Sequence, residues 1–453
     1  MSHPMKRASR NDRGRRRAAA TGAAVLGLAL TATACGGGTS SDSKQELKGQ
    51  SVTVAGVWTG VEQKNFKKVL QAFEDKTGAE TNFISTGDNV STVIGSKIEG
   101  GNAPDVVMVP QPGVLKQFAD KNWLQPLSAN VYEKAGINFA PVWRDYGSIN
   151  GKYYGLYFKA SHKSTVWYSP DAFAQAGVQP PKTFDALLKT GKTLSDSGLP
   201  AFSVAGEDGW TLTDWFENVY LSQEGPKKYD RLAEHKIKWT DPSVVKALTT
   251  LGKLFKDKNM VAGGTSEALR TDFPESVENV FGNEPKAGMV YEGDFVGGIV
   301  SGEFKKKVGK DAKFFGFPAV KGGKEPVVAG GDAAAVLKAG KNREAAMKLV
   351  EFFATPEAAK IWAEAGGFIS PNEKLDLDAY QDATSRKTAE SIVNAGDAVR
   401  FDMSDLAPAA FGGTQGAGEW KVLQDFLRDP SDPEGAAEKL EAAAAKAYKD
   451  TQN

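Results

Sequence analysis

The sequence is poor in the side chains that most often bind metals or act as nucleophiles. Its 453 residues include one cysteine and three histidines, and one of those histidines is His3 near the N-terminus. A Cys/His zinc site and a Cys–His nucleophile pair therefore lack their residues. A lone cysteine forms no disulfide within the chain, so stability has to come from core packing. We expect no metal, no cofactor and no catalytic residue.

Motifs for ester, phosphate and dinucleotide chemistry are also missing. The chain has no Gly-x-Ser-x-Gly elbow. Ala186 stands where a phosphate loop ending in Gly191-Lys192-Thr193 needs its first glycine, and Lys421 stands where a dinucleotide fingerprint needs its third. Carboxylates are plentiful, so a glycoside hydrolase that uses two carboxylates stays open as an alternative.

The long apolar run at the N-terminus has the form of an export signal. Arg15, Arg16 and Arg17 precede the apolar residues 18–34, and Cys35 follows directly. A basic head, an apolar stretch of this length and a small-residue cleavage site predict a signal peptide at residues 1–34. An uncleaved anchor is the alternative, and export by the Sec or the twin-arginine route stays open.

Cys35 is the first residue expected after cleavage. The Ala-Thr-Ala before it resembles the lipobox of bacterial lipoproteins, with Ala32 where leucine is usual. The resemblance implies that Cys35 carries a lipid that anchors the protein to the extracellular face of the cell membrane. We expect residues 35–50, rich in Gly, Ser, Thr and Lys, to be the lipidated cysteine and a flexible tether.

The charge of the chain is unevenly distributed. Residues 1–34 carry a net charge of +6 while the whole chain is formally neutral, so the mature part is near −6. An acidic surface argues against nucleic acid as a partner and against electrostatic adhesion to the membrane beyond the lipid itself. The remaining length is too great for one ordinary core and predicts two lobes.

The first third of the mature chain alternates strand and helix patterns. Short buried strands are predicted at 52–57, 79–84 and 104–110, and helical patterns follow each of them. This alternation predicts a largely parallel sheet with helices on both faces. Ligands of such sheets bind beyond the carboxyl ends of the strands, where Trp58 and Gln111 stand.

The rest of the chain is more helical. Strands are predicted at 153–158, 165–168, 287–291, 314–318 and 327–329. Helices dominate up to about residue 283, and a helical pattern at 344–364 is interrupted where Thr355 can cap its second half, with Pro356 in the first position. The tail at 434–449 is an Ala/Glu/Lys helix.

The order of these pieces resembles the extracellular sugar-binding proteins of ABC importers, the maltose and α-glucoside type among them. The likeness covers nearly all of the chain after the tether, and its individual motifs are short. The segments that carry it are 73–78 (FEDKTG), 100–107 (GGNAPDVV), 150–156 (NGKYYGL), 165–169 (TVWYS), 287–295 (AGMVYEGDF) and 315–318 (FGFP).

The resemblance implies an α/β fold of the two-lobed periplasmic-binding-protein type II, with discontinuous lobes and a hinge. Lobe 1 is expected at 51–157 plus 312–366 and lobe 2 at 158–311 plus 367–450. It further implies a monomeric solute-binding protein that captures a carbohydrate by hinge closure and delivers it to an ABC permease. The expected ligand is an oligosaccharide, with an α-glucoside as the narrower expectation.

Sugar binders combine aromatic platforms for C–H faces with carboxylates or amides that accept hydroxyl protons. In this chain, aromatics lie beside acids at predicted loop positions. The predicted binding residues are Trp58, Asp88, Gln111, Trp210, Glu292, Asp294, Phe295, Asp332, Asp402 and Trp420.

Several of these residues have a structural alternative. Trp58 and Trp420 could pack in a core, and Asp88 could cap a helix. Trp215 is expected in a core. Lys159 and His162 follow the aromatic strand and could serve the site or be solvated. Arg400, Asp402 and Asp405 form a charged loop that could bind sugar or be a surface ion-pair network.

Two functions of other classes stay open beside solute capture. A lipid-anchored glycoside hydrolase would need two facing carboxylates, and a cell-wall-binding protein would bind polymer without hinge closure. Within the binding class, few histidines disfavour a metal ligand, and loops of aromatics and acids favour sugar over peptide.

Overall fold

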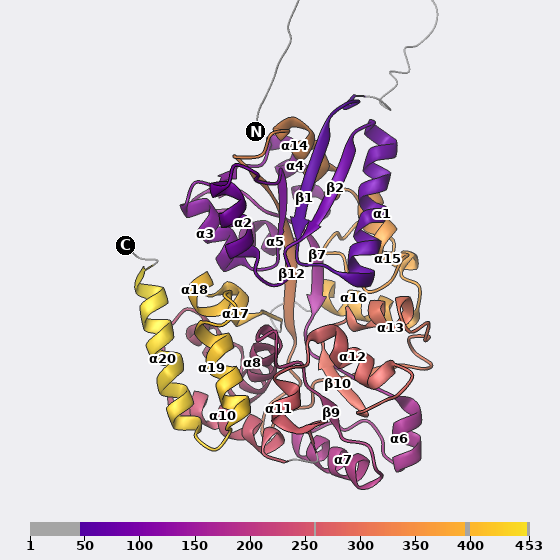
Figure 1. Ribbon diagram of the computed structural model, residues 1–453, viewed down its shortest axis with the longest axis vertical. Helices are drawn as coiled ribbons and strands as arrows, with labels where there is room; N and C mark the ends of the chain where they lie inside the picture. Colours follow the sequence, from indigo (N-terminus) through magenta and orange to yellow (C-terminus); the bar gives the residue numbers. More distant parts are fainter. Residues whose placement is uncertain (1–45, 258–259, 395–398, 451–453) are drawn as a thin grey trace, which may run out of the picture. The chain divides into compact units, whose positions relative to one another are not determined.

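The computed structural model describes residues 46–257, 260–394 and 399–450. The predicted signal peptide, Cys35 and the first part of the predicted tether lie outside these residues. The described chain builds two large β-sheets, each with its own hydrophobic core, and these are the two lobes of Figure 1. The mixed α/β architecture with two lobes confirms the fold class that the sequence predicts.

The first lobe is built around parallel strands. β1 pairs in parallel with β2 and β3, while β12 runs antiparallel to β3 and β7. The sheet consists of β1 (Ser51–Gly56), β2 (Glu80–Ser85), β3 (Val106–Val109), β4 (Leu124–Gln125), β7 (Leu156–His162), β12 (Val328–Leu337) and β13 (Arg400–Phe401). All four side chains of β3 are buried, as expected for a strand that is covered on both faces.

Helices whose apolar residues contribute to the first core surround this sheet. They are α1 (Gly60–Thr77), α2 (Val90–Glu99), α3 (Pro112–Asp120), α4 (Ala129–Asn138), α5 (Pro141–Tyr146), α14 (Arg343–Phe353), α15 (Pro356–Ala363) and α16 (Ala383–Asn394), with the short helix η2 (Leu377–Ala379) and the hairpin β5 (Ser148–Ile149) and β6 (Lys152–Tyr153). In the described ranges, no helix is both long and apolar enough to cross a bilayer.

The second lobe has a smaller sheet and more helix. Its strands, in spatial order, are β11 (Lys313–Gly316), β8 (Thr165–Tyr168), β10 (Met289–Glu292) and β9 (Phe202–Ser203). Its helices are α6 (Pro170–Ala176), α7 (Phe184–Asp196), α8 (Trp210–Glu224), α9 (Pro226–Ala233), α10 (Pro242–Phe255), α11 (Gly264–Ala268), α12 (Phe273–Phe281), α13 (Val296–Gly302), α17 (Met403–Leu406), α18 (Ala409–Gly412), α19 (Gly418–Arg428) and α20 (Pro433–Asp450).

Strands β7 and β12 connect the two lobes. They pair from Ala329 opposite His162 to Ala334 opposite Leu156, with a shift of register after Asp332. Val328 packs in the second core, whereas the far end of β12 packs in the first, and Figure 1 shows both strands running between the lobes. A few crossing strands of this kind can act as a hinge.

A local sequence signal placed the start of α15 (Pro356–Ala363) correctly. The side chain of Thr355 accepts a hydrogen bond of 3.3 Å from the Ala358 N–H, and Pro356 occupies the first position of α15. The break inside the 344–364 helix is therefore confirmed, since a capping hydroxyl followed by proline favours a new helix start.

Two strand predictions needed correction. The strand expected at 327–329 extends to Leu337, although the added residues are mostly Gly and Ala, because β12 lies between β3 and β7 with every side chain buried. A Cβ on Gly331 would lie 2.7 Å from the Lys159 carbonyl oxygen, so only glycine fits there. The strand expected at 153–158 is divided at Gly155 into β6 and β7.

The cores divide the chain at other residues than the predicted lobe boundaries. Strand β11, expected in lobe 1, pairs with β8 in the second sheet. Phe368, Leu375 and Tyr380, expected in lobe 2, pack in the first core. Both segments follow a crossing between the lobes, where the sequence pattern carries no mark of which core the next element joins.

The predicted flexible tether also ends earlier than residue 50. Leu47 is buried in the first core, and its N–H donates a 3.0 Å hydrogen bond to the Thr77 carbonyl oxygen at the end of α1. Glu46 pairs with Lys348 on α14 at 3.4 Å. The burial of Leu47, which removes apolar surface from water, acts together with these two contacts to hold the chain here.

Trp362 lies at the centre of the first core and is fully buried against Trp58, Phe66 and Phe368. We predict that Trp362→Ala lowers the free energy of unfolding by about 3–5 kcal/mol, because it leaves a large cavity. Trp123→Ala, at a half-buried position, is the matched control and should cost much less. Urea unfolding of both variants measures the difference, and equal losses would contradict this picture of the core.

Candidate functional site

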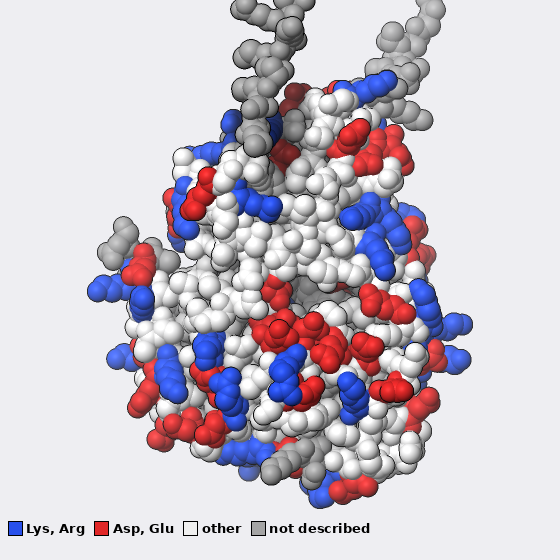
Figure 2. Space-filling view, in the orientation of Figure 1, with Lys and Arg blue, Asp and Glu red and all other residues white. Residues whose placement is uncertain are grey.

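A cavity of about 350 Å³ is lined by residues of both lobes. Figure 2 shows a hollow on this face of the molecule with acidic side chains gathered beside it. The lining residues are Val57, Trp58, Thr59, Glu62, Gly87, Asp88, Pro110, Gln111, Lys159, Ser161, Lys163, Asp208, Trp210, Asp272, Phe273, Pro274, Phe295, Gly331, Asp332, Asp405 and Trp420.

The fold explains why these residues meet. Trp58, Asp88 and Gln111 follow the carboxyl ends of β1, β2 and β3, which lie at one edge of the first sheet. Lys159 and Asp332 come from the crossing strands β7 and β12 and are paired across the ladder. The second lobe contributes the loop before α8, the start of α12 and the start of α13.

Seven of the ten predicted binding residues line this cavity. They are Trp58, Asp88, Gln111, Trp210, Phe295, Asp332 and Trp420. Their placement brings the predicted set together, while their contact with a ligand stays a prediction. Trp58 is only 3% exposed and packs edge-on against Trp362 with ring centroids 4.8 Å apart, so much of its surface belongs to the core.

Glu292, Asp294 and Asp402 are not among the residues that line the cavity, and their contact with a ligand also stays a prediction. Asp402 is fully buried: it caps α17 by accepting from the Asp405 N–H at 2.9 Å, and it binds Lys163. Asp294 accepts a 2.7 Å hydrogen bond from the His162 N–H. Glu292 ends β10 with its side chain in the interior. A carboxylate near a strand end can accept hydrogen bonds from backbone N–H groups or bind a ligand. The sequence pattern alone does not distinguish these two roles.

Aromatic rings gather around Trp210. Its ring centroid lies 5.6 Å from that of Phe273 and 6.2 Å from that of Phe295. Trp420 packs against Gly209, where a Cβ would lie 2.8 Å from the Trp420 Cβ, and its buried indole Nε1 has no hydrogen-bond partner. Flat apolar faces and an unused donor are therefore present in the cavity wall.

Both lysines of the cavity are held by acids. Lys159 Nζ lies 2.7 Å from Glu62 Oε1, and Lys163 Nζ lies 2.5 Å from Asp402, 3.3 Å from Asp214 and 3.5 Å from Asp405. Burial opposes the charge of Lys163, but the surrounding carboxylates outweigh it and raise its pKa well above the ordinary value. The two ammonium groups are thus charged and already paired.

Four other carboxyl groups of the cavity have raised pKa values. Burial raises the pKa of Asp332 to about 6 and that of Asp405 to about 8. Burial together with the nearby Asp88 raises the pKa of Asp208 to about 7. The pKa of Asp88 is also raised by burial, although hydrogen bonds with Trp210 and Asp208 oppose the rise. Near neutral pH these groups can accept hydrogen bonds and, where protonated, donate them.

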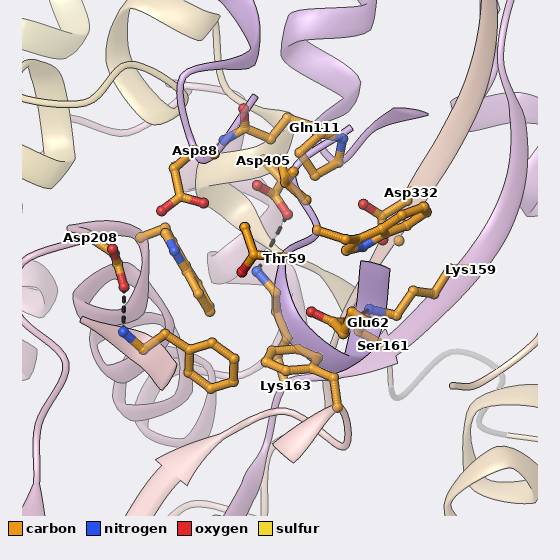
Figure 3. A pocket seen from close by; sticks show the side chains of 18 of the residues that line it. Thr59, Glu62, Asp88, Gln111, Lys159, Ser161, Lys163, Asp208, Asp332 and Asp405 are labelled. Carbon is orange, nitrogen blue, oxygen red and sulfur yellow. Dashed lines mark hydrogen bonds and ion pairs between the residues drawn. The ribbon is translucent and has the colours of Figure 1, made fainter. Parts of the chain in front are cut away.

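Figure 3 shows how these groups are arranged around the cavity. Asp88 and Asp208 lie on one side, where Asp208 Oδ2 accepts a 2.6 Å hydrogen bond from the Phe273 N–H. Asp332 and Lys159 lie on the other side. Polar groups thus face the space from opposite walls.

Sequence reasoning missed several cavity residues. Glu62 lies in the first turn of the helix that begins just after Trp58, and Asp208 stands two residues before Trp210. Proximity to a predicted residue was therefore a usable signal for both. Asp272 and Phe273 begin α12, and nothing in their pattern distinguished them from an ordinary helix start.

The residues that the sequence left open are now placed. Asp405 and Lys159 line the cavity. His162 does not, and burial lowers its pKa to about 4. Arg400 pairs with Asp230 at 2.6 Å. Trp215 is buried in the second core as expected. Among the described residues, no group of three or more His, Cys, Asp or Glu side chains is placed to hold a metal ion.

Two α/β lobes that are joined by crossing strands around a cavity are typical of proteins that close around a bound solute. The chain belongs to the family of bacterial extracellular solute-binding proteins, whose model matches residues 58–360. It is 32% identical to the α-glucosides-binding periplasmic protein AglE of Rhizobium meliloti over 86% of both chains. It is 29% identical to the osmoprotective compounds-binding protein GgtB of Synechocystis over 89% of this chain and 94% of that one.

Solved structures share the fold. The bacterial solute receptor AcbH superposes with a TM-score of 0.75 at 21% identity, covering 88% of this chain and 99% of that one. The GacH receptor of Streptomyces glaucescens superposes with a TM-score of 0.72 at 17% identity, covering 89% and 100%. The relatives are binding proteins and receptors, which supports the expectation that this chain is not an enzyme.

The raised pKa of Asp208 makes folding sensitive to pH. Its value moves from 3.8 to about 7, so between about pH 4 and pH 7 the folded protein holds a proton that the unfolded chain has released. Stability therefore falls as the pH rises through this window. We predict that the free energy of unfolding of Asp208→Asn falls less between pH 5 and pH 8 than that of the wild type, by on the order of 2 kcal/mol.

Melting temperatures at pH 5 and pH 8 test this for the wild type and Asp208→Asn. The amide keeps an oxygen for the Phe273 N–H. Asp75→Asn, at an exposed position on α1, is the control and should change with pH as the wild type does. An unchanged pH response in Asp208→Asn would refute the assignment.

Proposed function

We propose that this protein captures a carbohydrate in the cavity between its lobes and delivers it to an ABC permease. The observation that carries the proposal is the composition of the cavity wall. Aromatic faces from Trp210, Trp420 and Phe295 stand beside the carboxyl groups of Asp332 and Asp405. Sugars present C–H faces that stack on aromatic rings and rims of hydroxyls that donate to carboxylates.

The buried polar groups of the cavity support a hydroxyl-rich ligand. Asp332 lines the cavity and is only 5% exposed. It is paired with Lys159 across the β7–β12 ladder. The Trp420 Nε1 has no partner. A ligand with many donors and acceptors would satisfy such groups, whereas an apolar ligand would leave them unpaired at a cost.

The names of the relatives agree with this ligand class. AglE is described as an α-glucosides-binding protein, and GacH was solved in complex with acarbose and an acarbose homologue. GgtB is described as binding osmoprotective compounds. We propose an oligosaccharide as the ligand, and an α-glucoside as its narrower class.

Capture by hinge closure follows from the position of the cavity. Its wall draws on both lobes, so a ligand gains its full set of contacts only when they are together, and this differential contact favours the closed form. Contacts between the lobes are already present: Gln111 Nε2 donates to the Gly412 carbonyl oxygen at 3.2 Å, and Asn89 Nδ2 donates to Gln415 Oε1 at 2.5 Å. We propose the hinge at the crossing strands and lobes near the predicted ranges, adjusted for β11 and for residues 368–380.

We further propose that a lipid on Cys35 holds the monomeric protein at the extracellular face of the membrane. Tethering would raise its effective concentration near the permease. The glycoside hydrolase alternative loses support because the relatives are binding proteins. A cell-wall-binding protein would show no change of dimensions with ligand, so X-ray scattering with and without sugar separates that alternative.

A thermal-shift screen of residues 36–453 against mono- and oligosaccharides tests the proposed function. A ligand that binds only the folded protein raises the melting temperature. We predict a clear shift with one glucoside family, and affinities about ten- to a hundredfold weaker in Trp210→Ala and Trp420→Ala, because each loses a stacking face.

Trp123→Ala is the matched control, since Trp123 does not line the cavity. Calorimetric titration with the sugar found in the screen gives the affinities. No shift with any sugar would refute the carbohydrate assignment, and equal affinities in all three variants would refute the placement of the sugar.

The lipid anchor has its own test. We predict that cells supplied with labelled palmitate incorporate it into the wild-type protein and that Cys35→Ala abolishes incorporation, because the chain has no other thiol. The variant should leave the membrane fraction while retaining sugar binding. Membrane association of Cys35→Ala at the wild-type level would contradict the anchor.

A further inference from the structure

Acids outnumber bases among the residues that line the cavity. Six carboxyl groups and two ammonium groups belong to the lining side chains. Both ammonium groups are paired within the lining, since Lys159 lies 2.7 Å from Glu62 and Lys163 lies 3.5 Å from Asp405. Asp332 is the ladder partner of Lys159. The lysines thus stand beside three of the six acids, and the other three have no base beside them.

These three acids, Asp88, Asp208 and Asp272, are called the acidic wall below. Asp88 follows β2 in the first lobe, whereas Asp208 and Asp272 precede α8 and α12 in the second. The charge of Asp272 is close enough to the other two carboxyl groups to raise the pKa of each. In the part of the chain that the structure describes, no basic side chain forms an ion pair with any of the three. Figure 2 shows acidic side chains gathered beside the hollow.

Asp88 and Asp208 meet although they belong to different lobes. Their side chains share a hydrogen bond, and two carboxyl groups form one only when one of them carries a proton. Figure 3 shows both on the same side of the cavity. The Phe273 N–H donates to Asp208 Oδ2 at 2.6 Å, which holds that side chain in place. A proton therefore occupies the position between two fixed acceptors where a cationic group of a ligand would be attracted.

Aromatic rings adjoin the acidic wall. Trp210 forms a hydrogen bond with Asp88, and its ring centroid lies 5.6 Å from that of Phe273. The Trp210 ring already attracts one cation, because Lys163 Nζ lies 5.4 Å from its centroid. The negative faces of aromatic rings attract ammonium groups, and carboxylates beside them add charge-assisted hydrogen bonds. This side of the cavity therefore combines the two features that favour a positively charged nitrogen.

The opposite side of the cavity suits neutral donors. Asp332 is 5% exposed, and its carboxyl group has no hydrogen bond or ion pair with the rest of the described chain. A buried acceptor without a partner indicates a ligand that donates to it. Lys159 stands next to it and would repel a second cation, so a hydroxyl is the donor that fits here.

We infer that the ligand is an amino sugar, whose ammonium group binds at the acidic wall while its hydroxyl groups face Asp332. This inference rests on the proposed function and narrows its ligand class. The ammonium would take the place of the proton between Asp88 and Asp208, which would leave for the solvent. Because these two residues belong to different lobes, the same ammonium would contact both lobes and favour their closed arrangement.

An amine fits the acidic wall better than a metal ion does. Within the described ranges, no group of three or more His, Cys, Asp or Glu side chains is arranged to hold a metal. An ammonium group needs no fixed coordination shell, and it donates up to three hydrogen bonds. It also gains from the faces of Trp210 and Phe273, whereas a metal ion that keeps its bound water would not reach them.

The test compares sugars in matched pairs by calorimetric titration of the purified mature protein at pH 7. The probes are glucose, galactose and maltose, each with counterparts in which the hydroxyl at C2, C3 or C6 of one sugar unit is replaced by an amine. The acidic-wall variants are Asp88→Asn and Asp208→Asn. The controls are Asp332→Asn, on the opposite side of the cavity, and Asp75→Asn, at an exposed position on α1.

We expect at least one amino counterpart to bind the wild type about tenfold or more tightly than its neutral parent. In Asp88→Asn and Asp208→Asn this ratio should fall to near one. Asp332→Asn should weaken parent and counterpart alike and keep the ratio, and Asp75→Asn should keep both affinities. Melting temperatures show that each variant is folded.

Wild-type protein that binds a neutral sugar but none of its amino counterparts more tightly would overturn the inference and leave the proposed function intact. A ratio that stays high in both acidic-wall variants would overturn it as well. Calcium or putrescine that binds as tightly as the amino sugar, and no longer binds Asp208→Asn, would assign the acidic wall to a metal ion or a simple amine instead. Absence of binding to every sugar, neutral or basic, would contradict the proposed function itself.

Discussion

The antiparallel ladder between β7 and β12 is the constraint on which the molecule depends. It joins the two cores, and it also carries Lys159, Ser161 and Asp332 to the cavity wall. Gly331 allows the backbones to approach because any side chain there would strike the Lys159 carbonyl oxygen. A single pair of strands thus fixes both the connection between the lobes and the floor of the site, so motion at the hinge and shape of the cavity are coupled.

The charges next to this ladder explain how an acid-rich interior stays folded. Lys163, the residue after β7, places its ammonium among Asp214, Asp402 and Asp405. Burying several carboxyl groups near one ammonium is tolerated because some carry a proton, as the raised pKa of Asp405 indicates. Replacing Lys163 alone would destabilise the folded protein strongly, because the buried acids would then lack a compensating charge.

Much of the fold could be predicted because local signals and the wider topology agree. The strands after Ser51 are β-branched and end in turn residues, and caps such as Thr355 mark helix starts. What failed required tertiary knowledge. The Gly and Ala residues of β12 form a strand because of their neighbours, and Asp402 and Asp294 bind backbone groups that only the folded chain brings near. Strand ends and aromatics pointed to seven of the residues that line the cavity, whereas lining residues such as Asp272 carried no distinguishing pattern.

The burial of Leu47 in the first core limits how far the folded protein can lie from Cys35. Leu47 lies twelve positions after Cys35, and even a fully extended chain of that length spans only about 40 Å. If a lipid on Cys35 anchors the protein, the folded part therefore stays close to the membrane. The greatest distance that it can reach is its own diameter plus the length of the chain between Cys35 and Leu47. Diffusion so close to the membrane is nearly two-dimensional, so the search for a permease becomes a search over a surface rather than through a volume.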